Sequence, residues 1–247
     1  MGLFDIFSNK PTPSKIEKLA KKMLNEHQQI QIRQEAIDEL VNFGTPESIG
    51  ALVRRLGVNF KDTIKNEQEK KYITKVLVEH FGPSSIEPMM HHIRTAQNIS
   101  SVIMTLAKIM PEDKLVLFLL ETLGQYQPDD HRSIEPRSQL IDALGDHNHD
   151  EVLPALLPYL MDHDDNIRIK VMDVIDDRVD KTHSAFQVVV SGLCDVLKDT
   201  YASGRITRRA ASILSDRDTN LSKHSAGLQD FVPDGYTLGT NGRLSKS

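Results

Sequence analysis

Residues 137–175 read RSQLIDALGDHNHDEVLPALLPYLMDHDDNIRIKVMDVI. Apolar residues recur here every three or four positions, which is the spacing of one face of an α-helix. Two polar corners interrupt the pattern, Gly145-Asp146 and Asp164-Asp165. Glycine commonly ends helices, and an aspartate side chain accepts hydrogen bonds from the first N–H groups of a helix. The stretch therefore predicts alternating helices and tight corners, with a new helix beginning near Ile167.

The same pattern continues in both directions with a nearly constant period. Short corners of Gly, Pro, Ser or Asp begin near residues 44, 82, 110, 145, 180 and 215, so that successive corners are 28 to 38 residues apart. Each interval has room for two helices of about a dozen residues. No segment alternates with period two, so no sheet is expected. The repeat predicts an all-α solenoid of about five to six helical hairpins over residues 15–220, in which each amphipathic pair buries its faces on the next.

Specific motifs recur at the corners. Ala143-Leu144-Gly145-Asp146 ends a first helix, Val152-Leu153-Pro154-Ala155-Leu156 forms a second, and Asp164-Asp165-Asn166-Ile167-Arg168 opens the next pair. These motifs resemble the HEAT-repeat family, in particular the short bacterial PBS-lyase HEAT-like repeat. Residues 43–52 and 82–89 resemble it as well, and the resemblance covers roughly residues 28–216.

The resemblance implies structural roles for the residues at the repeat corners. They are Gly44, Pro46, Gly82, Pro88, Gly145, Asp146, Pro154, Asp164, Asp165 and Arg168. In this family an arginine like Arg168 pairs with acidic residues of a neighbouring corner, which gives Asp164, Asp165 or Asp146 as its candidate partners. The corners also predict helix caps, at Thr45 before Pro46, at Ser84 and Ser85, and at Asp164 and Asp165.

Composition excludes several classes of protein. The chain has 247 residues, a net charge of −5, 5% aromatic residues, no Trp and one Cys. A single cysteine rules out a disulfide framework and a thiolate zinc site within one chain. The aromatic shortage disfavours β-sandwiches and barrels, and the acidic balance disfavours a general nucleic-acid binder. The N-terminus lacks the basic residues of a secretory signal, so a cytoplasmic protein is expected.

No catalytic, cofactor or metal site is predicted. HEAT-type iron enzymes such as deoxyhypusine hydroxylase carry His-Glu pairs, and no histidine of this chain is followed by Glu. The His- and Asp-rich loops 146–150 and 162–165 have ligand-like composition, but polar corners between helices are the favoured explanation for both. Cys194 lies in an apolar run, which favours a small core residue over a thiolate nucleophile.

Charge is distributed unevenly along the repeats. Between Asp142 and Asp180 there are eleven acidic and three basic residues, whereas between Lys181 and Arg217 there are six basic and three acidic ones. A solvated polar face explains such patterns by default, and a binding strip on the concave face is the sharper hypothesis. Its candidate partner-binding residues are Arg54, Arg55, His91, His92, Arg94, Arg205, Arg208 and Arg209.

These observations favour a non-enzymatic scaffold or adaptor that binds another protein on its concave face. A bilin-lyase-like enzyme or accessory protein that grips a prosthetic group is the first alternative, because phycobilin lyases share this repeat type. A helical-repeat nucleic-acid binder is the second, and only the arginines at 205, 208 and 209 support it.

The two ends of the chain differ from the repeats. Residues 1–14 combine an apolar segment, Leu3 to Phe7, with a Pro/Ser linker. This segment is expected to cap the first repeat, with docking on a partner or a membrane surface as alternatives. Residues 221–247 lose the period and include extended segments around a turn at residues 239–242. They predict a C-terminal cap, a hairpin or an interaction tail.

Overall fold

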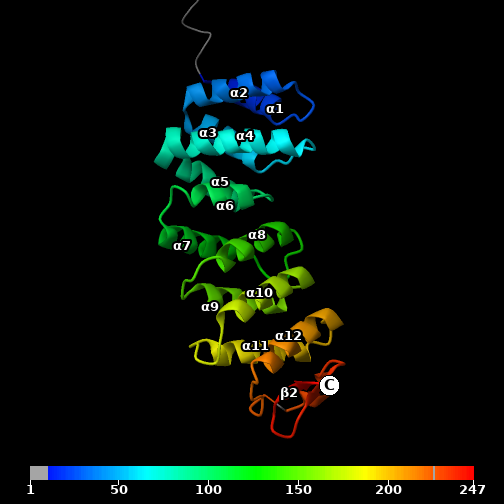
Figure 1. The fold of residues 1–247 in the computed structure, drawn as a ribbon. Coiled ribbons are helices and arrows are strands. Elements are labelled where there is room, and N and C mark those ends of the chain that lie inside the picture. The colour runs from blue at the N-terminus through cyan, green and yellow to red at the C-terminus, as the bar shows by residue number, and fades with distance from the viewer. Residues whose placement is uncertain (1–10, 225) are drawn as a thin grey trace, which may run out of the picture. The chain divides into compact units, whose positions relative to one another are not determined.

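The computed structural model describes residues 11–224 and 226–247. The apolar segment Leu3 to Phe7 lies outside the described residues. The chain divides into two compact units, Met1–Leu115 and Val116–Ser247, which are called here the N-terminal and the C-terminal unit. The boundary falls inside the range 15–220 that the repeat pattern covers. Both units consist of helices in succession, which confirms the all-α fold class (Figure 1).

Helices of the N-terminal unit pair in chain order (Figure 1). Among them α1, α3 and α5 form one row, in which α3 contacts both α1 and α5. The helices are α1 (Pro13–Met23), α2 (Ile30–Phe43), α3 (Pro46–Leu56), α4 (Thr63–Lys75), the π-helix η1 (Val76–Phe81), the 3-10 helix η2 (Gly82–Ser85), α5 (Ile86–Thr95) and α6 (Ser100–Leu106).

The corner between α2 and α3 forms for the local reasons expected. Gly44 ends α2 with a left-handed φ of 60°, a conformation that glycine adopts without steric cost. The Thr45 side chain accepts from the backbone N–H of Ser48, the Ser48 hydroxyl accepts from the N–H of Thr45, and Pro46 occupies the first helical turn. This capping box confirms the predicted start of α3.

The corner before α5 differs from the prediction that Ser84 and Ser85 cap this helix. Ser85 at the N-cap position makes no capping bond with its side chain, and Ser84 lies inside the preceding helix η2. The buried Ser85 hydroxyl instead donates to the carbonyl of Leu77 at 2.9 Å. A buried hydroxyl needs a hydrogen-bond partner, and here the carbonyl in η1 supplies it.

In the C-terminal unit two rows of helices can be followed. Helix α10 contacts both α8 and α12, and η3 contacts α11. The elements are α7 (Glu112–Leu123), which spans the boundary, α8 (Ile134–Gly145), α9 (Val152–Leu156), the 3-10 helix η3 (Leu157–Met161), α10 (Asp165–Arg178), α11 (Phe186–Lys198), α12 (Gly204–Asp216), the 3-10 helix η4 (Gln229–Phe231), β1 (Tyr236–Leu238) and β2 (Leu244–Lys246). Asp164 caps α10 by accepting from the N–H groups of Asn166 and Ile167, as predicted.

Buried arginines connect successive hairpins in both units. Arg33 of α2 reaches Glu69 of α4, Arg137 of α8 reaches Asp162 before α10, and Arg168 of α10 reaches Asp199 before α12. The predicted partners of Arg168 are therefore wrong. The residues Asp164, Asp165 and Asp146 lie in its own or the preceding corner, whereas the arginine extends forward to the next one. Such charge-assisted bonds fix the register of one hairpin on the next.

The C-terminal segment forms a hairpin that packs on α12. Strands β1 and β2 are antiparallel, with Thr237 opposite Ser245. Strand β2 contacts α12, and Lys246 forms an ion pair with Asp216 at 2.8 Å. The side chains of Leu221 and Leu228, and that of Leu244 in β2, are buried. The segment therefore forms a hairpin, one of the three alternatives, and its packing on α12 is also what a cap of the last helix would require.

Among the residues that the structure describes, no helix combines the length and the apolar character needed to cross a membrane.

Candidate functional site

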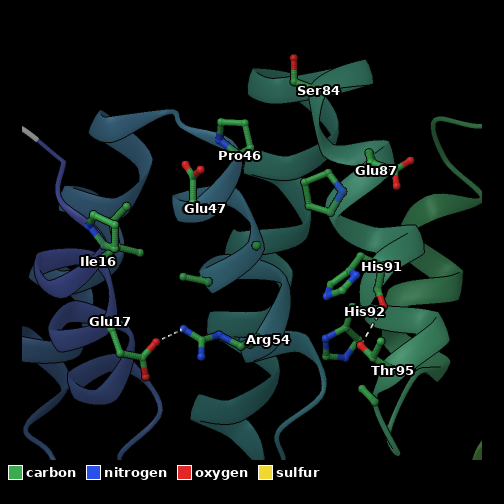
Figure 2. A pocket seen from close by; sticks show the side chains of 15 residues that line it. Ile16, Glu17, Pro46, Glu47, Arg54, Ser84, Glu87, His91, His92 and Thr95 are labelled. Atoms are coloured by element: carbon green, nitrogen blue, oxygen red, sulfur yellow. Dashed lines mark hydrogen bonds and ion pairs between the residues drawn. The ribbon is translucent and has the colours of Figure 1, made fainter.

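A groove of about 940 Å³ crosses the row of α1, α3 and α5 in the N-terminal unit (Figure 2). It is called here the α1–α3–α5 groove. Its lining comes from one face of each helix and consists of Pro13, Ile16, Glu17, Pro46, Glu47, Gly50, Ala51, Arg54, Ser84, Glu87, Pro88, His91, His92, Thr95 and Ala96. Within α3 the lining residues fall at 46–47, 50–51 and 54, so they recur every three or four positions, as residues on one helical face do.

The middle of the groove is apolar and has space above α3. Ile16 and Ala51 contribute almost wholly buried side chains, and Pro88 adds an apolar surface from α5. A Cβ atom added at Gly50 would meet no atom within 4 Å. The glycine therefore leaves free volume at the centre of the groove rather than allowing two helices to approach closely.

The groove is polarised along its length. The carboxylates of Glu47 and Glu87 lie at the end where α3 and α5 begin (Figure 2). Arg54, His91 and His92 lie toward the end where these helices finish. Acidic residues in a first helical turn and basic residues in a last turn match the helix dipole, so the same sequence preference that stabilises each helix also gives the groove an acidic and a basic end.

Arg54 is held in place by a residue of α1. Its Nη2 atom donates to Glu17 Oε2 at 2.8 Å, and both side chains are partly exposed (Figure 2). The hydrogen bond from Arg54 holds the pKa of Glu17 below its ordinary value. The pair links α1 to α3 across the groove, and it leaves the other guanidinium N–H groups of Arg54 available to a ligand.

The two adjacent histidines have different roles. His91 is exposed, whereas His92 is half-buried and its Nε2 atom lies 3.3 Å from the carbonyl oxygen of Asn98. Burial lowers the pKa of His92, which favours the neutral ring at neutral pH. Gly57 allows this arrangement, because a Cβ atom there would come within 2.9 Å of both His92 Nε2 and the Asn98 carbonyl oxygen.

Two other predicted residues of this region do not line the groove. Arg55 has no exposed surface; its guanidinium binds Glu69 and lies 3.8 Å from the centre of the Phe60 ring. The prediction that Arg55 contributes to a partner-binding surface is therefore wrong, because α3 turns it about 100° away from Arg54. Arg94 is half-buried in the last turn of α5.

The three predicted arginines of α12 bind groups of their own unit. Arg209 forms ion pairs with Asp173 at 2.7 Å and with Asp176 at 3.0 Å. Arg205 donates to Asn166, and Arg208 donates to the backbone carbonyl of Gly204. The two aspartates of α10 offset the charge of Arg209, so this helix is less basic on its surface than its sequence indicates.

The predicted structural residues lie at equivalent places in successive repeats. Gly44, Gly82 and Gly145 mark the ends of α2, η1 and α8. The prolines Pro46, Pro88 and Pro154 lie in the first turns of α3, α5 and α9, where a missing N–H leaves no helical bond unmade. Asp146 follows α8 directly as its C-cap.

Neither a cluster of metal ligands nor a reactive thiol is found in the part of the chain that the structure describes. No group of three or more His, Cys, Asp or Glu residues gathers as metal ligands anywhere in the ranges 11–224 and 226–247. Cys194 is buried in α11, and burial raises the pKa of its thiol to about 11. This thiol is therefore protonated at neutral pH and packs as a small apolar side chain.

Sequence reasoning missed the acidic and apolar parts of the groove. Glu47, Gly50 and Arg54 are spaced by three and four residues, and so are Ser84, Glu87, His91 and Thr95. This spacing places each set on one face of its helix. Selecting basic residues alone found Arg54, His91 and His92 but left out the partners that share their faces.

Comparison with known proteins adds one finding. No family model and no curated protein matches the chain. Among solved structures, human deoxyhypusine hydroxylase in complex with glycerol is similar at 14% identity, covering 89% of this chain and 92% of that chain with a TM-score of 0.34. A similarity at this level supports no functional argument. What the chain shows by itself is an all-α fold of repeated helical hairpins.

Proposed function

We propose that the protein is a non-enzymatic interaction module that binds a segment of another protein in the α1–α3–α5 groove. The observation that carries the proposal is the groove itself, which extends over three helices with an apolar centre, two carboxylates at one end and the Arg54–Glu17 pair with His91 and His92 at the other. Grooves between helices commonly accept a helix or an extended segment whose apolar residues fill the centre.

The polarity of the groove specifies the chemistry of its occupant. An acidic residue of the partner fits the end with Arg54 and His91, and a basic residue fits the end with Glu47 and Glu87. Small apolar side chains between them fit the space over Gly50. Rim charges of this kind set orientation and association rate more than affinity, while burial at the centre supplies most of the binding free energy.

Gly50 offers a direct test of the proposal. A Gly50→Trp substitution places a large side chain in the groove, at a position where an added Cβ atom meets no atom within 4 Å. Circular dichroism checks that the variant folds. Gly50→Ala is the matched control, because it changes the same backbone position but leaves the volume mostly free. We expect affinity purification from the native host to recover a partner with the wild-type chain and with Gly50→Ala, and to lose it with Gly50→Trp.

The partner must also be located in the groove. A photo-cross-linking residue at the exposed position Glu87 is expected to form a covalent product with the same partner, and Gly50→Trp should abolish that product. A residue on the exposed part of α7, at Leu117, serves as the control position. Equal recovery of the partner by all variants, with no product at position 87, would contradict the proposal.

A further inference from the structure

A second cavity, of about 620 Å³, lies wholly within the C-terminal unit. Its wall is formed by the corners that precede α9 and α11 and by the end of α10. The polar part consists of Asn148, His149, Asp150, Arg178, His183 and Ser184, and an apolar part is supplied by Leu153 and Val188, among others. The cavity shares no lining residue with the α1–α3–α5 groove, so its ligand is independent of the function proposed for that groove.

Two histidines occupy equivalent positions of successive hairpins in this cavity. The carbonyl of His149 accepts from the N–H of Val152 at 3.0 Å, and that of His183 accepts from the N–H of Phe186 at 3.0 Å. The ring Nδ1 of His149 accepts from the N–H of Glu151 at 3.2 Å, and that of His183 accepts from the N–H of Ala185 at 3.1 Å. The repeat therefore fixes both rings by the same pair of bonds.

These bonds determine the tautomer of each ring. A backbone N–H can only donate, so Nδ1 of His149 and of His183 must offer its lone pair. The proton of the neutral ring is then on Nε2, and each histidine presents an N–H donor there. A metal ion would need the Nε2 lone pair, which this tautomer does not supply. The two rings are consequently suited to a ligand that accepts hydrogen bonds.

Arg178 adds a positive charge to the same cavity. Its Nη1 and Nη2 atoms donate to the backbone carbonyls of His147 and Gly145. Carbonyl oxygens hold the guanidinium in position but do not neutralise its charge as a carboxylate does. Further N–H groups of Arg178 can therefore donate to an anion, and the Ser184 hydroxyl adds another donor to the wall.

Two carboxylates limit how much negative charge the cavity accepts. Asp150 is part of the wall. Asp180 lies beside His183, but its Oδ1 atom already accepts from the N–H groups of Thr182 and His183. Repulsion by these carboxylates disfavours a ligand that carries several anionic groups. A ligand with a single anionic group, placed at the donors of His149, His183 and Arg178, is therefore favoured.

We propose that this cavity binds a phosphate monoester. Its oxygens accept from Nε2 of His149, Nε2 of His183 and the Arg178 guanidinium, and its organic part lies against Leu153 and Val188. Donors from three residues that line one cavity suit the three terminal oxygens of a monoester better than the two oxygens of a carboxylate. The monoester is either free, as a small molecule, or carried on a phosphorylated side chain.

The test uses the full chain and defined probes in isothermal titration calorimetry. Phenyl phosphate, inorganic phosphate, a phosphoserine peptide and benzoate are each titrated into the protein. We expect phenyl phosphate to bind at least about fivefold more tightly than inorganic phosphate, because its ring contacts the apolar wall. Tighter binding of phenyl phosphate than of the peptide assigns a free small molecule, and the reverse assigns a phosphorylated partner.

Substitution of the histidines by asparagine isolates their donor role. The Asn side-chain oxygen can still accept from the N–H two residues ahead, so the corners keep their turns, but no donor remains at the position of Nε2. The double variant His149→Asn with His183→Asn should lose at least about tenfold in affinity for phenyl phosphate. His27→Asn, in the N-terminal unit, is the control and should bind like the wild-type chain.

If the double variant does not fold, a second measurement on the wild-type chain tests the proposal. In the wild-type chain, the imidazole NMR signals of His149 and His183 should shift on addition of phenyl phosphate, while that of His27 should not. Absence of binding by every phosphate probe at millimolar concentration would overturn the proposal. So would benzoate binding as tightly as phenyl phosphate, or binding by the folded double variant that equals the wild type.

Discussion

Buried charge is arranged differently in the two units. In the N-terminal unit one carboxylate, Glu69, accepts from two buried arginines, Arg33 and Arg55. In the C-terminal unit each buried arginine has its own aspartate, Asp162 for Arg137 and Asp199 for Arg168. Glu69 alone compensates the charges of two arginines. In the C-terminal unit each arginine is compensated by a separate aspartate, and the pairs are distributed over successive hairpins. The same repeat can thus be held together by one shared carboxylate with its two arginines, called here the Glu69 hub, or by a series of independent ion pairs.

Arg33 and Arg55 together carry more positive charge than Glu69 compensates, and their further contacts show how this charge is stabilised. Arg55 lies over the Phe60 ring and also donates to Asn66 at 3.0 Å. Arg33 donates to the backbone carbonyl of Gln28 at 2.7 Å. Cation–π contacts and carbonyl acceptors stabilise a buried guanidinium without a second carboxylate. The hub therefore depends on the full negative charge of Glu69.

Removal of the hub carboxylate is expected to have the largest effect. Glu69→Gln leaves two buried guanidinium groups without the carboxylate that they share and should lower the free energy of unfolding by about 4–5 kcal/mol. Urea denaturation followed by circular dichroism measures the change. Glu35→Gln, at an exposed position of α2, is the control and should stay within about 0.5 kcal/mol of the wild type. A loss below about 1 kcal/mol for Glu69→Gln would show that the hub does not need its charge.

Breaking one of the separate links should cost less. Asp162→Asn takes the charged partner from Arg137 alone, although both side chains are fully buried, and we expect a loss of about 3 kcal/mol. Cys194 provides the measurement, because its buried thiol reacts with a disulfide reagent only when α11 opens. Labelling of Cys194 at neutral pH should accelerate roughly a hundredfold, since about 1.4 kcal/mol corresponds to a factor of ten. Asp142→Asn, at an exposed site, should leave the labelling rate nearly unchanged.

Two helical glycines, one in each unit, differ in how closely they are packed. Gly192 of α11 lies against Leu160, and a Cβ atom there would approach Leu160 Cδ1 to 2.9 Å. Because Leu160 is itself buried, Gly192→Ala should destabilise the protein by about 1–2 kcal/mol through overpacking. Gly50→Ala in α3, where no atom lies within 4 Å of the added Cβ, should stabilise it by about 0.5–1 kcal/mol. Thermal denaturation of both variants measures the opposite signs, and equal signs would contradict the packing described for the two helices.

A further effect of about 1 kcal/mol concerns Asp176, a half-buried carboxylate that binds two arginines, and its dependence on pH. Burial of Asp176 acts to raise the pKa of its carboxyl, but the bonds from Arg217 and Arg209 outweigh this and hold the pKa below its ordinary value. A depressed pKa stabilises the fold above the unfolded value of about 3.9, and the contribution is lost as pH falls through the folded value. Asp176→Asn should therefore cost about 1 kcal/mol at pH 7, and the difference should shrink below about pH 4. A difference that stays constant down to pH 2 would show that the charge of Asp176 is not involved.

The sequence predicted those features of the fold that depend on local physics. The caps at Thr45 and Asp164 and the helix ends at Gly44 and Gly145 follow from the preferences of single residues, and all are present. The π-helix η1 and the 3-10 helix η2 could not be anticipated in this way. They depend on tertiary packing around Leu77 and Ser85, which no local pattern encodes.

The candidate site was harder to predict because it depends on which face of a helix turns inward. Adjacent residues Arg54 and Arg55 look alike in sequence, yet one lines the groove and the other is fully buried. Likewise, the partner of Arg168 is Asp199, in the following corner of the chain. Sequence spacing identified arginines suited to ion pairs but not the hairpin that each one reaches.

The forward reach of the buried arginines has a consequence for rearranging the repeats. The covalent unit of the chain ends at a corner such as Gly145-Asp146, but the ion pair that completes Arg137 closes only at Asp162, in the hairpin that follows. The segment of chain between two such corners and the segment that holds a complete ion pair are thus offset by about one helix. A deletion, duplication or chimera joined at the corner Gly145-Asp146 would separate Arg137 from its aspartate, whereas a junction at the corner Asp164-Asp165, after the aspartate, would transfer the pair intact. Exchangeable segments of this protein are therefore better defined by their charge pairs than by their turns.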